Sequence, residues 1–131
     1  DPGAAADLAR FKEIPQAGAA ASAERGHQLF VATCSACHSF DRNAAGPSLA
    51  GIFGRPAASA AGYDYSSALR AERFAWSGAR LDQWLADPQV AVPGAKMPVH
   101  VADAHDRRDI IAYLKLVTEQ SQAATGVTAI R

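Results

Sequence analysis

The chain is poor in cysteine, in lysine and in long apolar runs. Its 131 residues include two cysteines, one methionine and three lysines, and no apolar run is long enough to span a membrane. Thirteen basic residues balance thirteen acidic ones, so the chain has neither the strong basic field of a nucleic-acid-binding protein nor an acidic tail. No secretory leader is recognisable, and Asp1 is expected to be the start of a processed or trimmed chain. The length fits one domain with its own core.

Both cysteines lie in one pentapeptide, Cys34-Ser35-Ala36-Cys37-His38, which has the Cys-x-x-Cys-His form of a c-type haem attachment site. Two thiols at this spacing can add to the two vinyl groups of one haem, and the histidine can then reach the iron. Redox disulfides and zinc sites also use Cys-x-x-Cys. A zinc site needs a second ligand pair, and a thioredoxin-like motif needs alternating strands and helices, neither of which this sequence offers. Haem attachment is therefore the favoured interpretation.

Hydrophobic periodicity predicts an all-α chain with three main helices, a shorter helix and long turn-rich loops. No stretch alternates as a strand does. In chain order the predicted helices run from Ser22 into the pentapeptide, over residues 65–72, from Ser77 or Gly78 to Asp87-Pro88, and from Asp103 to about Gln120.

Two loops rich in glycine and proline separate these helices. Residues 39–59 form the longer one, and a loop of this length in a small domain is unusual unless it is functional or wraps a ligand. Residues 88–99 form the other and contain the only methionine, Met97. The domain is expected to cover residues 22–120, after an N-terminal extension or linker over residues 1–21 and before a frayed tail over residues 121–131.

The order of motifs resembles the class I cytochromes c, in their mitochondrial and bacterial cytochrome c2-like branch. The resemblance covers about residues 22–119 and rests on six motifs. They are the pentapeptide behind a helix with Gly26 and Phe30; Gly46-Pro47-Ser48-Leu49-Ala50-Gly51; Ile52-Phe53-Gly54-Arg55; Tyr63-Asp64-Tyr65-Ser66-Ser67-Ala68; Val92-Pro93-Gly94-Ala95-Lys96-Met97, whose methionine lies twenty-one residues after Trp76; and Asp109-Ile110-Ile111-Ala112-Tyr113-Leu114.

The resemblance implies a class I cytochrome c fold around one covalently attached haem c. Cys34 and Cys37 would carry the thioethers, and His38 would be one axial iron ligand, with its other ring nitrogen bonded to the carbonyl of Pro47. Met97 would be the second ligand, because its soft thioether suits an electron carrier. His100, three residues after Met97, is a competing candidate ligand.

The resemblance also assigns roles around the ligands. Arg55, Tyr65 and Trp76 would bond to buried haem propionates or offset their charge. Trp84 would lie beside the methionine sulfur, where the family usually has tyrosine. Lys96 alone matches the ring of lysines that surrounds the haem edge in relatives, so partner binding is expected to be mixed or apolar. The first and last helices would meet at Gly26 and Phe30.

The function that the resemblance implies is electron transfer, without enzymatic activity. A monomer would shuttle single electrons between redox proteins, a reductase or dehydrogenase and an oxidase or reaction centre of a respiratory or photosynthetic chain, in the bacterial periplasm. One alternative is a haem c domain or subunit of a larger oxidoreductase complex. Another is an enzyme or gas sensor with an open iron site, which would need Met97 to be absent or displaceable.

Overall fold

The computed structural model describes the backbone of residues 21–130 and the side chains of residues 21–123. In these residues there is no strand, only an isolated bridge between Pro56 and Ala75, so the predicted all-α class is confirmed. The predicted extension over residues 1–21 lies outside the described residues except for Ala21. The helices of the described part are α2 (Ala23–Thr33), α3 (Ser67–Arg70), α4 (Gly78–Ala86), α5 (Pro88–Ala91) and α6 (Ala104–Ile130).

Short polar side chains begin the helices. The Oγ atoms of Ser22, Ser66 and Ser77 each accept a hydrogen bond from the backbone N–H three residues further on, at 3.0–3.1 Å. At the start of α6, Oδ1 of Asp103 accepts a bond from the backbone N–H of His105 at 2.7 Å. These bonds satisfy N–H groups that have no partner inside a helix. The predicted starts at Ser22, Ser77 and Asp103 are confirmed.

Two predicted boundaries were wrong. The last helix does not end near Gln120 with a frayed tail but continues to Ile130. Residues 121–130 contain no proline and three alanines, so a helix that is already formed can extend through them. The segment after Asp87 is not a plain loop, because Pro88 takes the first position of α5. Proline suits that position, since the N–H group it lacks would have no partner there.

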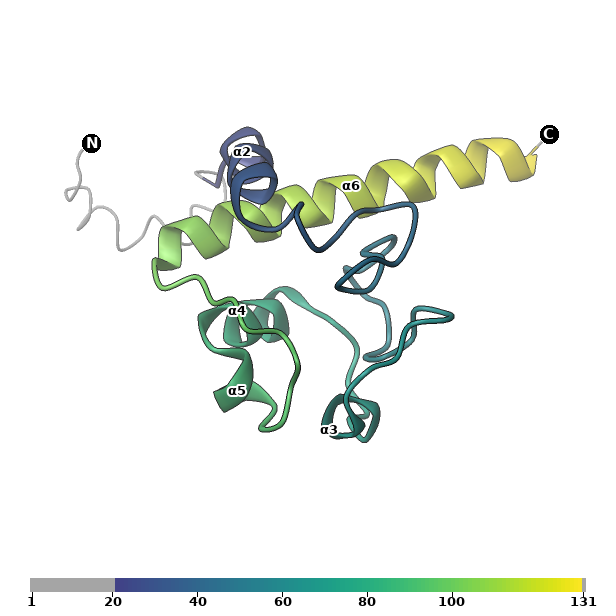
Figure 1. The fold of residues 1–131 in the computed structure, drawn as a ribbon. Helices are drawn as coiled ribbons and strands as arrows, with labels where there is room; N and C mark the ends of the chain where they lie inside the picture. The colour runs from purple at the N-terminus through teal and green to yellow at the C-terminus, as the bar shows by residue number, and fades with distance from the viewer. Residues whose placement is uncertain (1–20, 131) are drawn as a thin grey trace, which may run out of the picture.

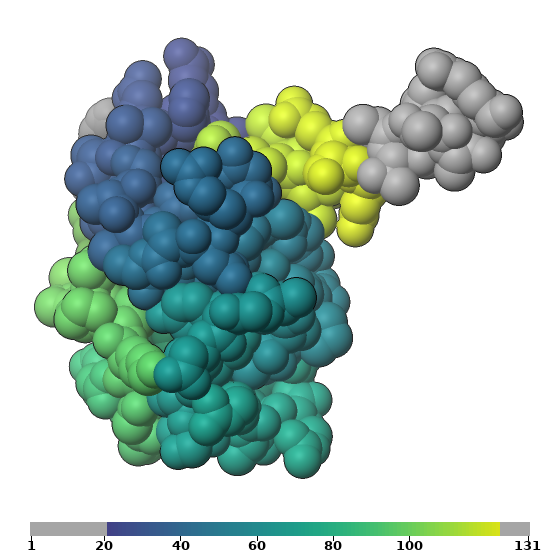
Figure 2. Space-filling view, turned by 45° about the vertical axis from the view of Figure 1, so that its right-hand side comes forward, coloured from purple at the N-terminus to yellow at the C-terminus, as the bar shows by residue number. Residues whose placement is uncertain are grey.

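The helix α6 is the longest element of the described residues, and α2 and α4 pack against it. It runs along one side of the molecule, and α2 crosses it there. In the view of Figure 1, α2 lies above α6, and α3, α4 and α5 lie below it. The part of α6 near residue 123 projects from the body of the molecule (Figure 2). No helix in the described part of the chain is both long enough and apolar enough to cross a membrane.

A glycine sets the distance between α2 and α6. A methyl group on Gly26 would lie 1.9 Å from the backbone oxygen of Asp109 and 2.9 Å from Cβ of Tyr113. Only glycine lets the two backbones approach so closely. One turn further along α2, the ring of Phe30 lies 5.5 Å from that of Tyr113, between centroids. The predicted contact between the first and last helices is therefore confirmed.

A buried carboxylate holds the same crossing. Asp109 is only 3% exposed, and its two oxygens accept hydrogen bonds from the backbone N–H of Ser22 at 2.9 Å and from Nη1 of Arg25 at 2.8 Å. Arg25 also donates to Asp106, and the two carboxylates raise the pKa of its guanidinium. A buried charge needs such partners, because removing it from water is costly. The motif order in the sequence did not reveal this network.

Replacing Gly26 by alanine tests the helix crossing. Alanine has the better helix propensity by about 1 kcal/mol, but its methyl group would force the backbones apart, which costs about 3 kcal/mol. We expect Gly26→Ala to lower the free energy of unfolding by about 2 kcal/mol, measured by guanidinium denaturation of the haem-loaded protein. Gln28→Ala, an exposed change in the same helix, is the control for propensity. Equal or greater stability of Gly26→Ala would contradict the close contact.

Candidate functional site

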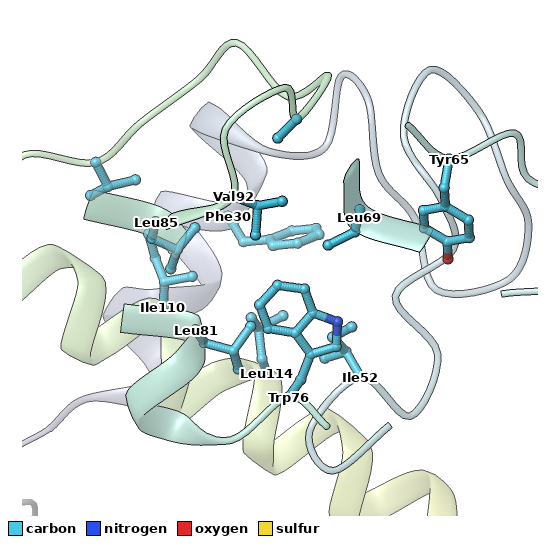
Figure 3. Packing of buried hydrophobic residues seen from close by; sticks show 12 residues of the cluster. Phe30, Ile52, Tyr65, Leu69, Trp76, Leu81, Leu85, Val92, Ile110 and Leu114 are labelled. Carbon is cyan, nitrogen blue, oxygen red and sulfur yellow. The ribbon is translucent and has the colours of Figure 1, made fainter. Parts of the chain in front are cut away.

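A cavity of about 510 Å³ lies between the helices and the two long loops. Its volume is typical of a cofactor site. Its walls are largely apolar, and Figure 3 shows Phe30, Leu69 and Trp76, from separate segments, directed towards a shared space. All the site residues predicted from the sequence line this cavity: Cys34, Cys37, His38, Pro47, Arg55, Tyr65, Trp76, Trp84 and Met97.

The pentapeptide begins where α2 ends. Cys34 is the C-cap of this helix, and its carbonyl accepts hydrogen bonds from the backbone N–H groups of Cys37 at 3.1 Å and His38 at 2.9 Å. This turn brings Cys34, Cys37 and His38 together at the cavity, which all three line. Burial raises the pKa of the Cys34 thiol to about 11. A reactive redox cysteine has a lowered pKa instead, so the burial of the Cys34 thiol argues against a thioredoxin-like motif.

The His38 ring is held by the loop that follows it. Its Nδ1–H donates to the carbonyl of Pro47 at 2.9 Å, as expected, which leaves the lone pair of Nε2 for a metal. Burial lowers the pKa of His38 below its usual 6.5, so the neutral form predominates at pH 7. A methyl group on Gly46 would lie 2.4 Å from Cε1 of the ring. Glycine at this position therefore lets the imidazole lie against the loop backbone.

The second loop brings the methionine to the same cavity. Met97 is partly buried, and Nε1–H of Trp84 donates to its sulfur atom at 3.1 Å. Trp84 lies on α4 and packs edge-on against Trp76, with ring centroids 5.4 Å apart. Trp84 thus lies beside the sulfur, as expected. His100, the competing ligand, is exposed and does not line the cavity.

Arg55 places an unbalanced positive charge at the cavity wall. Its Nη1 donates to the carbonyls of Ser48 at 2.9 Å and Ala50 at 2.8 Å. Its Nε is buried with no hydrogen-bond partner among the described residues, and burial lowers the pKa of the guanidinium. Such a group calls for an anion. The hydroxyl of Tyr65, also at the cavity, accepts a bond from the backbone N–H of Ala60 at 2.9 Å.

These features together fit a covalently attached haem: two thiols, one neutral imidazole, one thioether, a large apolar cavity and a buried cation for an acid group. The family model for cytochrome c matches residues 23–118, which is most of the chain. The chain belongs to the cytochrome c family. Proteins of this family carry haem c, bound covalently and holding one iron.

Individual relatives agree with the family assignment. The chain is 41% identical over 106 residues to the cytochrome c-type cyt cy of Rhodobacter capsulatus, covering 79% of this chain and 53% of that protein. It is 37% identical to a cytochrome c of Guizotia abyssinica, covering 84% of this chain and 99% of the other. The solved structure of cytochrome cH from Methylobacterium extorquens superposes with a TM-score of 0.69 at 44% identity, covering 72% of this chain and 98% of that one. These matches confirm the class I cytochrome c fold.

Two amides that shape the site were missed by the sequence reasoning. The side chain of Asn43 donates to the carbonyl of Ala61 at 2.9 Å and accepts from the N–H of Ser48 at 2.8 Å, which joins the first loop to the segment that follows it. Asparagine among glycines and prolines is a recognised turn signal and could have indicated this role. The other amide, Gln89 of α5, bonds to the second loop, and nothing in the sequence pattern indicated it.

Replacing Gly46 by alanine tests how closely the His38 ring packs against the loop backbone. The added methyl group would displace the His38 ring or the loop, so we expect the haem-loaded protein to lose about 1–3 kcal/mol of unfolding free energy in urea. Gly78→Ala is a matched control, because a methyl group there meets its nearest neighbour at an ordinary 3.7 Å. Equal stability of the two variants would contradict the proposed packing of Gly46 against His38.

Proposed function

We propose that this protein is a one-electron carrier in which His38 and Met97 are the two axial ligands of the haem iron. The observation that carries the proposal is that the imidazole with its free Nε2 and the thioether sulfur line one apolar cavity. When bound, the haem supplies an iron centre that accepts and releases one electron. A thioether ligand favours ferrous iron and raises the reduction potential, which suits a carrier.

The other cavity residues hold and shield the group. Cys34 and Cys37 would carry the thioether bonds, and the carbonyl of Pro47 would keep the imidazole oriented and basic. Arg55, with Tyr65 and Trp76 near it at the cavity wall, would offset the propionate charge. With His38 and Met97 both bound to the iron, no position on it would remain open to a substrate. The protein is therefore proposed not to be an enzyme.

The partners are proposed to be redox proteins that bind briefly through a small interface. At the cavity, Nζ of Lys96 donates to the carbonyl of Asp64 at 2.8 Å and lies 3.5 Å from its carboxylate. The charge of this lysine is thus partly balanced within the chain, which supports docking through mixed or apolar contacts rather than a strong positive field. The carrier is proposed to act as a monomer between a reductase or dehydrogenase and an oxidase or reaction centre of a respiratory or photosynthetic chain.

The proposed compartment is the bacterial periplasm, since two similar proteins come from the bacteria Rhodobacter capsulatus and Methylobacterium extorquens. The second candidate function is a haem c domain or subunit of a larger oxidoreductase. The observation that favours it is that the Rhodobacter relative is longer than the segment it shares with this chain, which covers 53% of that relative. Copurification with one partner at fixed stoichiometry would favour the second candidate, whereas a monomer that exchanges electrons with several partners would favour the first.

The axial ligands can be tested by absorption spectroscopy of the ferric protein. We expect a methionine–iron charge-transfer band near neutral pH, and we expect Met97→Ala to abolish it because no other sulfur remains available to the iron. His100→Ala is the control and should retain the band. A wild-type spectrum without the band, or a Met97→Ala spectrum that retains it, would refute the assignment.

Trp84→Phe tests the hydrogen bond to the sulfur. The indole N–H draws electron density from the thioether, so removing it should make the sulfur a stronger donor and stabilise ferric iron. We expect the reduction potential to fall by roughly 20–60 mV, the electrochemical equivalent of one neutral hydrogen bond. Trp84→Tyr restores a donor and should recover part of the shift. Potentials that are equal in all three proteins, measured by redox titration, would show that the bond does not tune the iron.

A further inference from the structure

The loop that carries Met97 is anchored at its two ends by backbone hydrogen bonds. The N–H of Val92 donates to the carbonyl of Pro88 at 2.9 Å, and the N–H of Val101 donates to the carbonyl of Leu85 at 2.7 Å. Both valines are buried. Most residues between them are exposed: Pro93, Gly94, Lys96, Pro98 and His100. Ala95 is buried between them, and its N–H donates to the carbonyl of Val92 at 3.0 Å. The exposed residues on either side are held little by burial and depend more on polar contacts.

The side-chain amide of Gln89 supplies such contacts on the N-terminal side of Met97. Its Nε2–H donates to the carbonyl of Ala95, and its Oε1 accepts from the backbone N–H of Gly94 at 3.3 Å. One amide thus uses both its donor and its acceptor on two adjacent residues of the loop. Within the described part of the chain, no other side chain bonds to the backbone of residues 93–96.

The helix α5 holds Gln89 in place. The carboxylate of Asp87 accepts hydrogen bonds from the backbone N–H groups of Gln89 at 3.1 Å and Val90 at 3.4 Å, which caps the helix. Pro88 is buried in its first turn and has a fixed φ angle. The glutamine therefore extends from a short, well-capped turn, and its side chain reaches across to the loop.

Two further polar contacts of the loop act on its side chains. Lys96 bonds to the carbonyl of Asp64, and the Met97 sulfur accepts the bond from Trp84. Trp84 can orient the sulfur only while the loop backbone stays close to the cavity. The side chain of Gln89 can keep the loop backbone near the cavity, because it bonds to the residues two and three positions before Met97.

We propose that Gln89 is a positioning residue that keeps the Met97 loop closed and so limits how often the sulfur moves away from the iron. The proposal rests on the function proposed above and adds to it a residue that controls how stably Met97 is held at the iron. Gln89 does not line the cavity, so it acts only through the loop. Loss of its amide should raise the open population of the loop without changing the chemistry of the cavity.

Gln89→Met tests the proposal, because methionine has a similar length but no amide. Gln28→Met, at an exposed position of α2 away from the cavity, is the matched control. Two readouts are needed: hydrogen–deuterium exchange of the Gly94 amide, followed by NMR, and the rate at which carbon monoxide binds to the reduced protein. We expect both rates to rise about fivefold in Gln89→Met, since losing hydrogen bonds of ordinary net strength changes an equilibrium by that order.

Gln89→Glu separates the two bonds. Its carboxylate can still accept from Gly94 but cannot donate to Ala95, so we expect the Gly94 exchange rate and the carbon monoxide binding rate both to lie between those of the wild type and of Gln89→Met. The same unfolding midpoint in all variants would show that the change is local. Gly94 exchange and carbon monoxide rates in Gln89→Met equal to those in Gln28→Met would overturn the proposal. Failure of the proposed function looks different, since the wild-type protein itself would then lack the methionine band while Gly94 exchange still reports on Gln89.

Discussion

The close approach of α2 to α6 is the constraint on which the rest of the site depends. At Gly26 the two backbones come so near that even a methyl group would meet the carbonyl oxygen of Asp109 at 1.9 Å. Phe30 lies one turn after Gly26 on the same face of α2, and Cys34 is the C-cap of this helix, so the contact also orients the end of α2 and the pentapeptide that follows it. A wider crossing would move both sulfur atoms away from the cavity wall.

Each of the two loops holds one candidate iron ligand, and the two use different contacts to do so. The first holds His38 by the carbonyl of Pro47 and by the space left at Gly46, and Asn43 joins this loop to the segment that follows it. The second is held by the amide of Gln89 and by the indole of Trp84. Each of these hydrogen bonds stabilises by only about 1 kcal/mol, so either loop can open locally without global unfolding.

Two buried charged groups, Asp109 and Arg55, differ in whether the chain itself supplies their partners. Asp109 is satisfied within the chain, by the Ser22 backbone and by Arg25, and it stabilises the helix crossing. Arg55 has two carbonyl partners, but its buried Nε has none among the described residues. A protein that folds around a haem can leave such a cation for the propionates to balance, whereas in an empty core it would be a defect.

Local sequence determined the elements and the cofactor chemistry of this protein. Capping residues such as Ser22 and Asp103 predicted helix starts because a cap acts on backbone groups a few residues away. The pentapeptide predicted haem attachment because its chemistry is contained in five consecutive residues. The tertiary structure alone decided the roles of Asp109 and Gln89, since their contacts join segments whose approach depends on the whole packed core. Helix α5 and the extension of α6 to Ile130 also lay beyond the sequence patterns, because a proline and a run of small polar residues are compatible with either loop or helix until neighbouring structure selects one.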